Sequence, residues 1–192
     1  TLSGRHAAAQ EHTEALSAHQ ALVGGLLRQG GKVAVSSVDW AHLVTLLNSS
    51  ALQLIGQGRM LLSTDTDEPA MRSAGTMLRT AEVLCLSDRL LPDATTRRGL
   101  ASLTATNCSC LHRSAGRWHT ALRCSLAALK HDERAGLNPA VSHLNCCATL
   151  AGLDRHEEAL RHARLACAVV TGSDVPSTPA SQVVSSVAHF NL

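Results

Sequence analysis

Two segments of this chain repeat each other at a fixed offset of 38 residues. The first contains Asn107-Cys108, Arg117, Ala121-Leu122-Arg123 and Ala128, and the second contains Asn145-Cys146, Arg155, Ala159-Leu160-Arg161 and Ala166. In helical repeat proteins each unit buries its apolar face only by stacking on the next unit. The offset therefore predicts stacked helical units, an architecture typical of interaction scaffolds.

Each unit is predicted to be two antiparallel helices joined by a short turn. The turn lies near Gly116 in the first unit and near Gly152 to Asp154 in the second. Small residues recur seven positions apart on each second helix, where they let a neighbouring helix approach closely. They are Ala121 and Ala128 in the first unit and Ala159 and Ala166 in the second.

These units resemble the tetratricopeptide repeat (TPR). The resemblance is carried by Leu144-Asn145-Cys146-Cys147-Ala148-Thr149-Leu150 and by Asp154-Arg155-His156-Glu157-Glu158-Ala159-Leu160. The period and the Asn138-Pro139-Ala140-Val141 start are similar to the kinesin-light-chain type of repeat, although most aromatic positions of the family are Leu, Ala, Cys or His here. The resemblance covers about residues 94–170 and implies an all-α, TPR-like α-solenoid of antiparallel helix pairs.

A third, partial unit is expected at the end of the chain. Thr178-Pro179-Ala180 repeats Asn138-Pro139-Ala140, in each case a capping residue followed by Pro at the first helical position. We therefore divide the chain into residues 1–92, an N-terminal helical segment with degenerate repeat character, and residues 93–192, TPR-like repeats of which the last is incomplete. The chain is expected to be a piece of a longer protein.

Apolar periodicity predicts further helices before and within the repeats. We expect helices over 5–29, 37–58, 69–90, 94–114, 117–132, 138–152, 155–170 and 177–192. The helix over 37–58 has the clearest pattern, is expected to stop at Gly56 to Gly58, and should bury Trp40, Leu43, Val44, Leu47, Ala51, Leu54 and Ile55. The helix over 69–90 should bury Met77, Leu78, Ala81, Leu84 and Cys85.

Composition narrows the class of partner. Hydrophobic residues make up 45% of the chain but aromatic residues only 2%, which favours helices over strands and argues against base-stacking surfaces for nucleic acid. The formal net charge of +2 comes from interspersed charges rather than from a basic stripe, and no apolar run is long enough to span a membrane. A protein partner is therefore predicted, with no nucleic acid, membrane or small-molecule substrate.

The sequence offers no convincing catalytic or cofactor motif. Cys108 and Cys110 would point about 200° apart on a helix, Cys146 and Cys147 about 100° apart, and a zinc-protease helix would need His at 160, where Leu stands. No Gly-x-Ser-x-Gly, phosphate-binding glycine loop or complete calcium loop occurs. We predict no enzyme activity, no metal and no cofactor. The odd count of seven cysteines favours free thiols and a reducing, cytoplasmic location.

The resemblance also implies where a partner would bind. In the TPR family the first helix of each unit lines the concave face, which places the groove at Leu103, Thr106, Cys110, Arg113, Val141, Leu144, Ala148 and Ala151. Such a face suits an apolar or helical segment of a partner. The alternative is a permanent structural subunit of a large assembly, associated with the cytoskeleton or with a cilium or axoneme.

Overall fold

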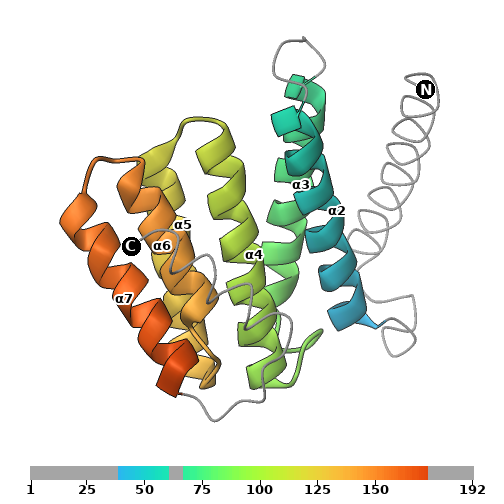
Figure 1. Ribbon diagram of the computed structural model, residues 1–192. Helices are drawn as coiled ribbons and strands as arrows, with labels where there is room; N and C mark the ends of the chain where they lie inside the picture. The colour runs from blue at the N-terminus through green and yellow to red at the C-terminus, as the bar shows by residue number, and fades with distance from the viewer. Residues whose placement is uncertain (1–38, 61–66, 173–192) are drawn as a thin grey trace. The chain divides into compact units, whose positions relative to one another are not determined.

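The computed structural model describes residues 39–60 and 67–172, and this part of the chain is all-helical. Its helices are α2 (Trp40–Met60), α3 (Asp67–Cys85), α4 (Ala94–Ser114), α5 (Trp118–Ala135), α6 (Ala140–Ala151) and α7 (His156–Gly172), labelled as in Figure 1. They agree with the six helices predicted between residues 37 and 170. The helices predicted over 5–29 and 177–192 lie outside the described residues.

The apolar pattern correctly identifies the buried faces of α2 and α3. All seven residues predicted to be buried on α2, and all five predicted on α3, are buried. Two predicted ends are wrong. α2 continues through Gly56 to Met60, since single glycines cost a packed amphipathic helix only about 1 kcal/mol each. α3 ends at Cys85 rather than near 90, because the amide of Ser87 donates to the carbonyl of Leu84, three residues back (3.2 Å), and the helix tightens there into a turn.

The turns that end α4 and α6 have the same backbone hydrogen bonds, 38 residues apart. After α4, the amide of Arg117 donates to the carbonyl of His112 (2.8 Å) and that of Gly116 to Arg113 (3.0 Å). After α6, the amide of Arg155 donates to Leu150 (3.0 Å) and that of Asp154 to Ala151 (3.1 Å). Gly116 and Asp154 both adopt positive φ, 69° and 58°. The repeat in the sequence is therefore also a repeat of turn geometry, the Schellman type of helix end.

We expect Asp154→Gly to raise the free energy of unfolding by about 0.5–1 kcal/mol. Asp154 is a non-glycine residue in the left-handed region, where its Cβ is disfavoured and Gly is not. Its side chain is exposed, so little else is lost. Chemical denaturation of the two proteins measures the difference. Gly116→Asp, the reverse change at the matching turn, should destabilise, and a stabilising effect there would contradict the explanation.

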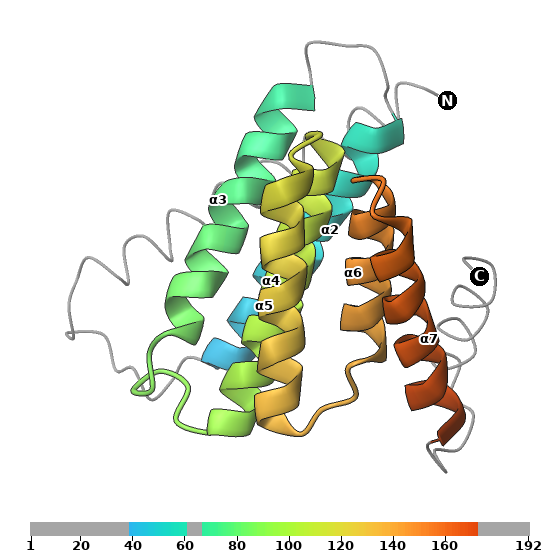
Figure 2. The same ribbon diagram turned by 90° about the vertical axis from the view of Figure 1, so that its left-hand side faces the viewer.

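The helices pack as consecutive pairs, α2 with α3, α4 with α5 and α6 with α7. α4 also contacts α2, α3 and α6, and α5 contacts α6, so α4 lies at the centre of the packing (Figures 1 and 2). Because α2 and α3 both pack on α4, contact is continuous across the predicted division between residues 92 and 93. That division stays a prediction about repeat character.

Much of the inter-helix contact at α4 is made by buried polar side chains. Asn107 on α4 donates to the side-chain oxygen of Asn48 on α2 (2.9 Å), and Asn48 donates to the hydroxyl of Thr104 (2.9 Å). On the side of α5, the hydroxyls of Ser109 and Ser125 lie 2.7 Å apart. These polar groups form hydrogen bonds with one another, so their burial leaves no unsatisfied donor or acceptor among these pairs.

No helix in the described part of the chain has both the length and the apolar character that a membrane crossing requires.

Candidate functional site

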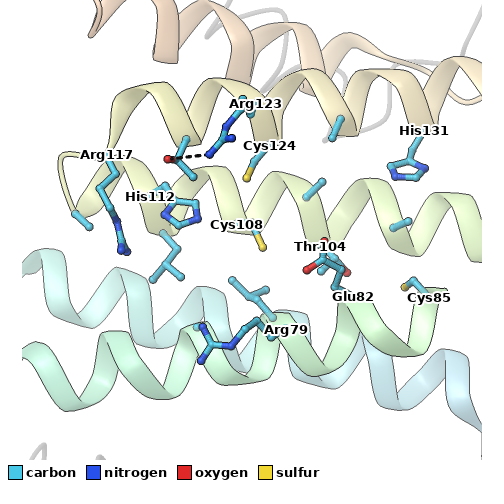
Figure 3. Close-up of a pocket in the computed structure, with 18 of the residues that line it drawn as sticks. Arg79, Glu82, Cys85, Thr104, Cys108, His112, Arg117, Arg123, Cys124 and His131 are labelled. Atoms are coloured by element: carbon cyan, nitrogen blue, oxygen red, sulfur yellow. Dashed lines mark hydrogen bonds between the residues drawn. The ribbon is translucent and has the colours of Figure 1, made fainter.

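A cavity of about 970 Å³ lies between α3, α4 and α5 (Figure 3). α4 forms its floor, and α3 and α5, which both pack on α4, form its walls. The floor residues of α4 recur every three or four positions, so they share one face of the helix. They are Ala101, Thr104, Ala105, Cys108, Leu111, His112 and Ala115.

Positive charge gathers around this cavity. Four arginines line it, against Glu82 as its one acidic lining residue: Arg72, Arg79, Arg117 and Arg123. In the described part of the chain, Arg79 and Arg123 donate to the hydroxyls of Thr76 (3.2 Å) and Thr120 (3.5 Å). No ion pair there involves Arg79, Arg117 or Arg123. The cavity is therefore suited to an anion.

The two ends of the cavity differ. Figure 3 places Arg117 and His112 at one end and Cys85 and His131 at the other. The imidazole Nδ1 of His112 is buried without a hydrogen-bond partner among the described residues. Burial, and then the positive charges of Arg117 and Arg123, lower the pKa of His112. His112 is therefore neutral at physiological pH and can still form a hydrogen bond with a ligand.

The thiols of the cavity are poor nucleophiles. Burial raises the pKa of Cys85 to about 11 and that of Cys108 to about 12, and it also raises the pKa of Cys124. The thiolate is the reactive form of cysteine, and these side chains stay protonated at neutral pH. All seven cysteines are unpaired. The cavity therefore offers shape, charge and hydrogen bonds rather than an activated nucleophile.

The eight groove residues predicted from the sequence lie elsewhere, on α4 and α6. Leu103, Val141 and Ala151 are exposed, and Thr106, Cys110, Arg113, Leu144 and Ala148 are half-buried. Arg113 links the two helices, because its guanidinium donates to the side-chain oxygen of Asn145 (3.3 Å). None of the eight lines the cavity. Successive helix residues lie about 100° apart, so the four predicted groove positions on α4 and the cavity floor are on opposite sides of that helix.

The cavity was missed because its signal is ambiguous in a sequence. Alanines and cysteines spaced three or four residues apart are typical of a helix buried against a neighbour. Arginines on the next helices are typical of solvated faces. These residues line a cavity only because α3 and α5 pack on α4 without filling the space between them. That spacing is a property of the tertiary structure and leaves no pattern in the sequence.

Within residues 39–60 and 67–172, no group of three or more His, Cys, Asp or Glu side chains could hold a metal ion. Two such groups on different helices, His143 and His162, do lie close together. The Nδ1 atoms of His143 on α6 and His162 on α7 lie 3.0 Å apart. Burial is the main cause that lowers the pKa of both, and each is lowered further by a neighbour, His162 for His143 and Arg161 for His162.

We expect the free energy of unfolding to fall as the pH drops from about 7 through the ordinary histidine pKa of 6.5. The folded pKa of His143 and His162 lies below the ordinary value of 6.5, so the unfolded chain takes up more protons as the pH falls. The contribution of these two histidines to the free energy of unfolding is fully present above about pH 7. It is lost as the pH falls towards their lowered pKa in the folded protein. Urea denaturation across this range measures the slope, which should be shallower in His143→Gln. A stability that rises on acidification would contradict this account.

The chain matches no known protein-family model, and comparison with curated proteins and with solved structures gave no match either.

Proposed function

We propose that this chain is a non-catalytic protein–protein interaction scaffold, built from TPR-like helix pairs, that binds an apolar or helical segment of a partner. The order of packing carries this proposal. Each helix pairs with the next, the first helices of neighbouring pairs contact each other (α2 with α4, α4 with α6), and each second helix contacts the following first helix (α3 with α4, α5 with α6). An α-solenoid has this order of contacts, because each unit touches only its neighbours.

The repeated turns support the same proposal. Because the hydrogen bonds after α4 and α6 match, the second helix of each unit begins at the equivalent position of the repeat. The small residues predicted to allow close packing of these second helices, Ala121, Ala128, Ala159 and Ala166, are all buried. α2 and α3 would then be an earlier unit. Asn48 on α2 and Asn107 on α4 bond each other, and Asn145 on α6 receives a bond from α4, so the three first helices are joined through asparagines.

The partner would bind along the first helices, at the eight groove positions on α4 and α6. Leu103 is 39% exposed and Val141 50%, so two large apolar side chains of the first helices are open to a partner. Apolar residues presented at helical spacing are the surface that an amphipathic helix recognises. Arg113 already shares its guanidinium with Asn145 and Cys110, which leaves it poorly placed to hold an acidic tail.

We expect Leu144→Glu to abolish partner binding, and Arg113→Ala to change it by no more than about threefold. A buried carboxylate in an apolar contact is costly, whereas Arg113 is a minor contributor to such a contact. The partner would be obtained by affinity capture with the protein from its native cells and then titrated against the purified variants. Thermal unfolding would establish that both variants fold.

A peptide that ends in Glu-Glu-Val-Asp serves as the opposing probe. TPR proteins that hold such tails use several cations, and residues 138–153 contain no Lys or Arg. No measurable binding is expected. Micromolar binding that is lost in Arg113→Ala would overturn the apolar groove.

The alternative is a permanent subunit of a large assembly of the cytoskeletal or ciliary kind. The observation that favours it is that large apolar side chains are left exposed on every described helix, such as Leu52 on α2, Val83 on α3 and Leu165 on α7. A monomeric, soluble chain in size-exclusion chromatography would favour reversible binding. Aggregation that a co-expressed partner relieves would favour the assembly. The unpaired thiols suit a reducing, cytoplasmic location in either case.

A further inference from the structure

The cavity between α3, α4 and α5 runs along most of the length of α4. Its lining residues on α4 run from Ala101 to Ala115, which at 1.5 Å per residue is about 21 Å. Its floor residues on α4 include Ala101, Ala105 and Ala115, and the walls add Gly75 and Ala127. Small side chains let a helix approach to the 8–10 Å between axes that is typical of helix packing. A helical segment of about four turns therefore matches the length of the cavity, and one face of it could enter between the walls.

The charge of the cavity specifies what such a helix must carry. The whole chain has a formal net charge of only +2, yet four arginines and one glutamate line this cavity. Arg79, Arg117 and Arg123 form no ion pair with a described residue. Figure 3 places Arg117 at the end where His112 lies, and Cys85 and His131 at the opposite end. The lining also includes large apolar side chains, among them Met71, Leu78 and Leu111. The complementary ligand has carboxylates near one end and an apolar body.

We propose that this cavity is a second docking site, for an α-helical segment of a partner protein that carries an apolar stripe and Asp or Glu residues near one end. The carboxylates accept hydrogen bonds from Arg79, Arg117 and Arg123, and the stripe lies on the floor formed by α4. This site is on the side of α4 opposite Leu103 and Arg113, so it does not depend on the groove proposed above. A scaffold with both sites joins two partners across one layer of helices.

The first experiment is a selection from a displayed library of helix-constrained peptides about 14 residues long, performed on the full chain. Peptides that also bind Ala105→Trp are removed, because that indole fills the floor of the cavity. We expect enrichment of sequences with Asp or Glu at one end and apolar residues at i, i+3, i+4 and i+7. No enrichment, or enrichment of basic sequences, would overturn the proposal.

The second experiment titrates an enriched peptide against two matched charge reversals. Arg123→Glu changes a cavity residue, and Arg161→Glu makes the same change in net charge at the position 38 residues later, on the exposed surface of α7. We expect about tenfold weaker binding for Arg123→Glu and less than about twofold for Arg161→Glu. Raising the salt from about 50 mM to about 500 mM should weaken the wild-type complex. Equal losses in both variants would overturn the proposal.

Two further measurements distinguish the proposed helix from other possible occupants of the cavity. If palmitate displaces the peptide and binds more tightly than the peptide does, the cavity is a site for a small anionic amphiphile. If the chain dimerises and Ala105→Trp abolishes the dimer, the cavity is occupied by a second copy of the chain. Either result overturns the proposal. Leu144→Glu, which changes a residue of α6 outside the cavity lining, should leave peptide binding unchanged, so failure of the groove and failure of the cavity are distinguishable.

Discussion

Ala159→Trp is expected to lower the free energy of unfolding by about 3 kcal/mol or more, the upper end of the cost of overpacking a core. Ala159 is 6% exposed and belongs to the buried cluster in which α7 meets α5 and α6. Its neighbours there are Leu122, Cys147, Leu150 and Ala163. An indole at this position cannot be accommodated unless α7 moves away from α6.

Arg161→Trp provides the matched comparison, two residues along the same helix. The side chain of Arg161 is 69% exposed, and its ion pair with Glu158 is long, at 3.7 Å. Its replacement is expected to change stability by about 0.5 kcal/mol or less. Thermal unfolding of the two variants measures both effects. Similar losses in the two would show that α7 is rotated from the orientation described.

Gly152→Ala is expected to cost about 2 kcal/mol, although a helix-propensity scale favours the change. Gly152 ends α6 with an ordinary right-handed conformation, so its backbone accepts any residue. A Cβ at this position would lie 2.4–2.8 Å from three atoms of the Trp118 ring at the start of α5. The substitution therefore drives Trp118 out of its contact with α6.

Gly56→Ala is the control for this prediction, because a Cβ on Gly56 of α2 meets nothing within 4 Å. It should stabilise by about 0.5–1 kcal/mol. In the double variant Gly152→Ala with Trp118→Leu, most of the lost stability should return, as a double-mutant cycle would measure. A neutral Gly152→Ala would mean that the Trp118 ring has room to move.

The sequence alone was sufficient to predict which helix faces are buried and which positions of the two repeated segments correspond. Apolar periodicity identifies the inward residues of α2 and α3, such as Val44 and Leu78, because a helix that packs on one side must place them at helical spacing. The burial of Ala159 beside an exposed Arg161 confirms the register of α7. Helix ends were less predictable, since the end of α3 at Cys85 depends on hydrogen bonds in the turn after it.

Contacts between distant residues were not predictable from one sequence. The sequence around Asn107 does not reveal whether its side chain faces solvent, a ligand or, as in the structure, Asn48, which lies 59 residues earlier. The closeness of Trp118 to Gly152 likewise depends on how α5 and α6 cross. The cavity is a property of three helices together, which explains why Arg79 and Arg123 gave no signal separately.

The buried amides and hydroxyls around α4 have a consequence for the alignment of the helices. A surface of Ala and Leu packs almost equally well after a neighbouring helix slides by one turn, about 5.4 Å. Such a slip would separate Asn107 from Asn48 and Ser109 from Ser125, and each orphaned buried group would cost about 1–3 kcal/mol. The polar pairs therefore select one longitudinal alignment of α2, α4 and α5, which the small apolar residues around them could not do alone.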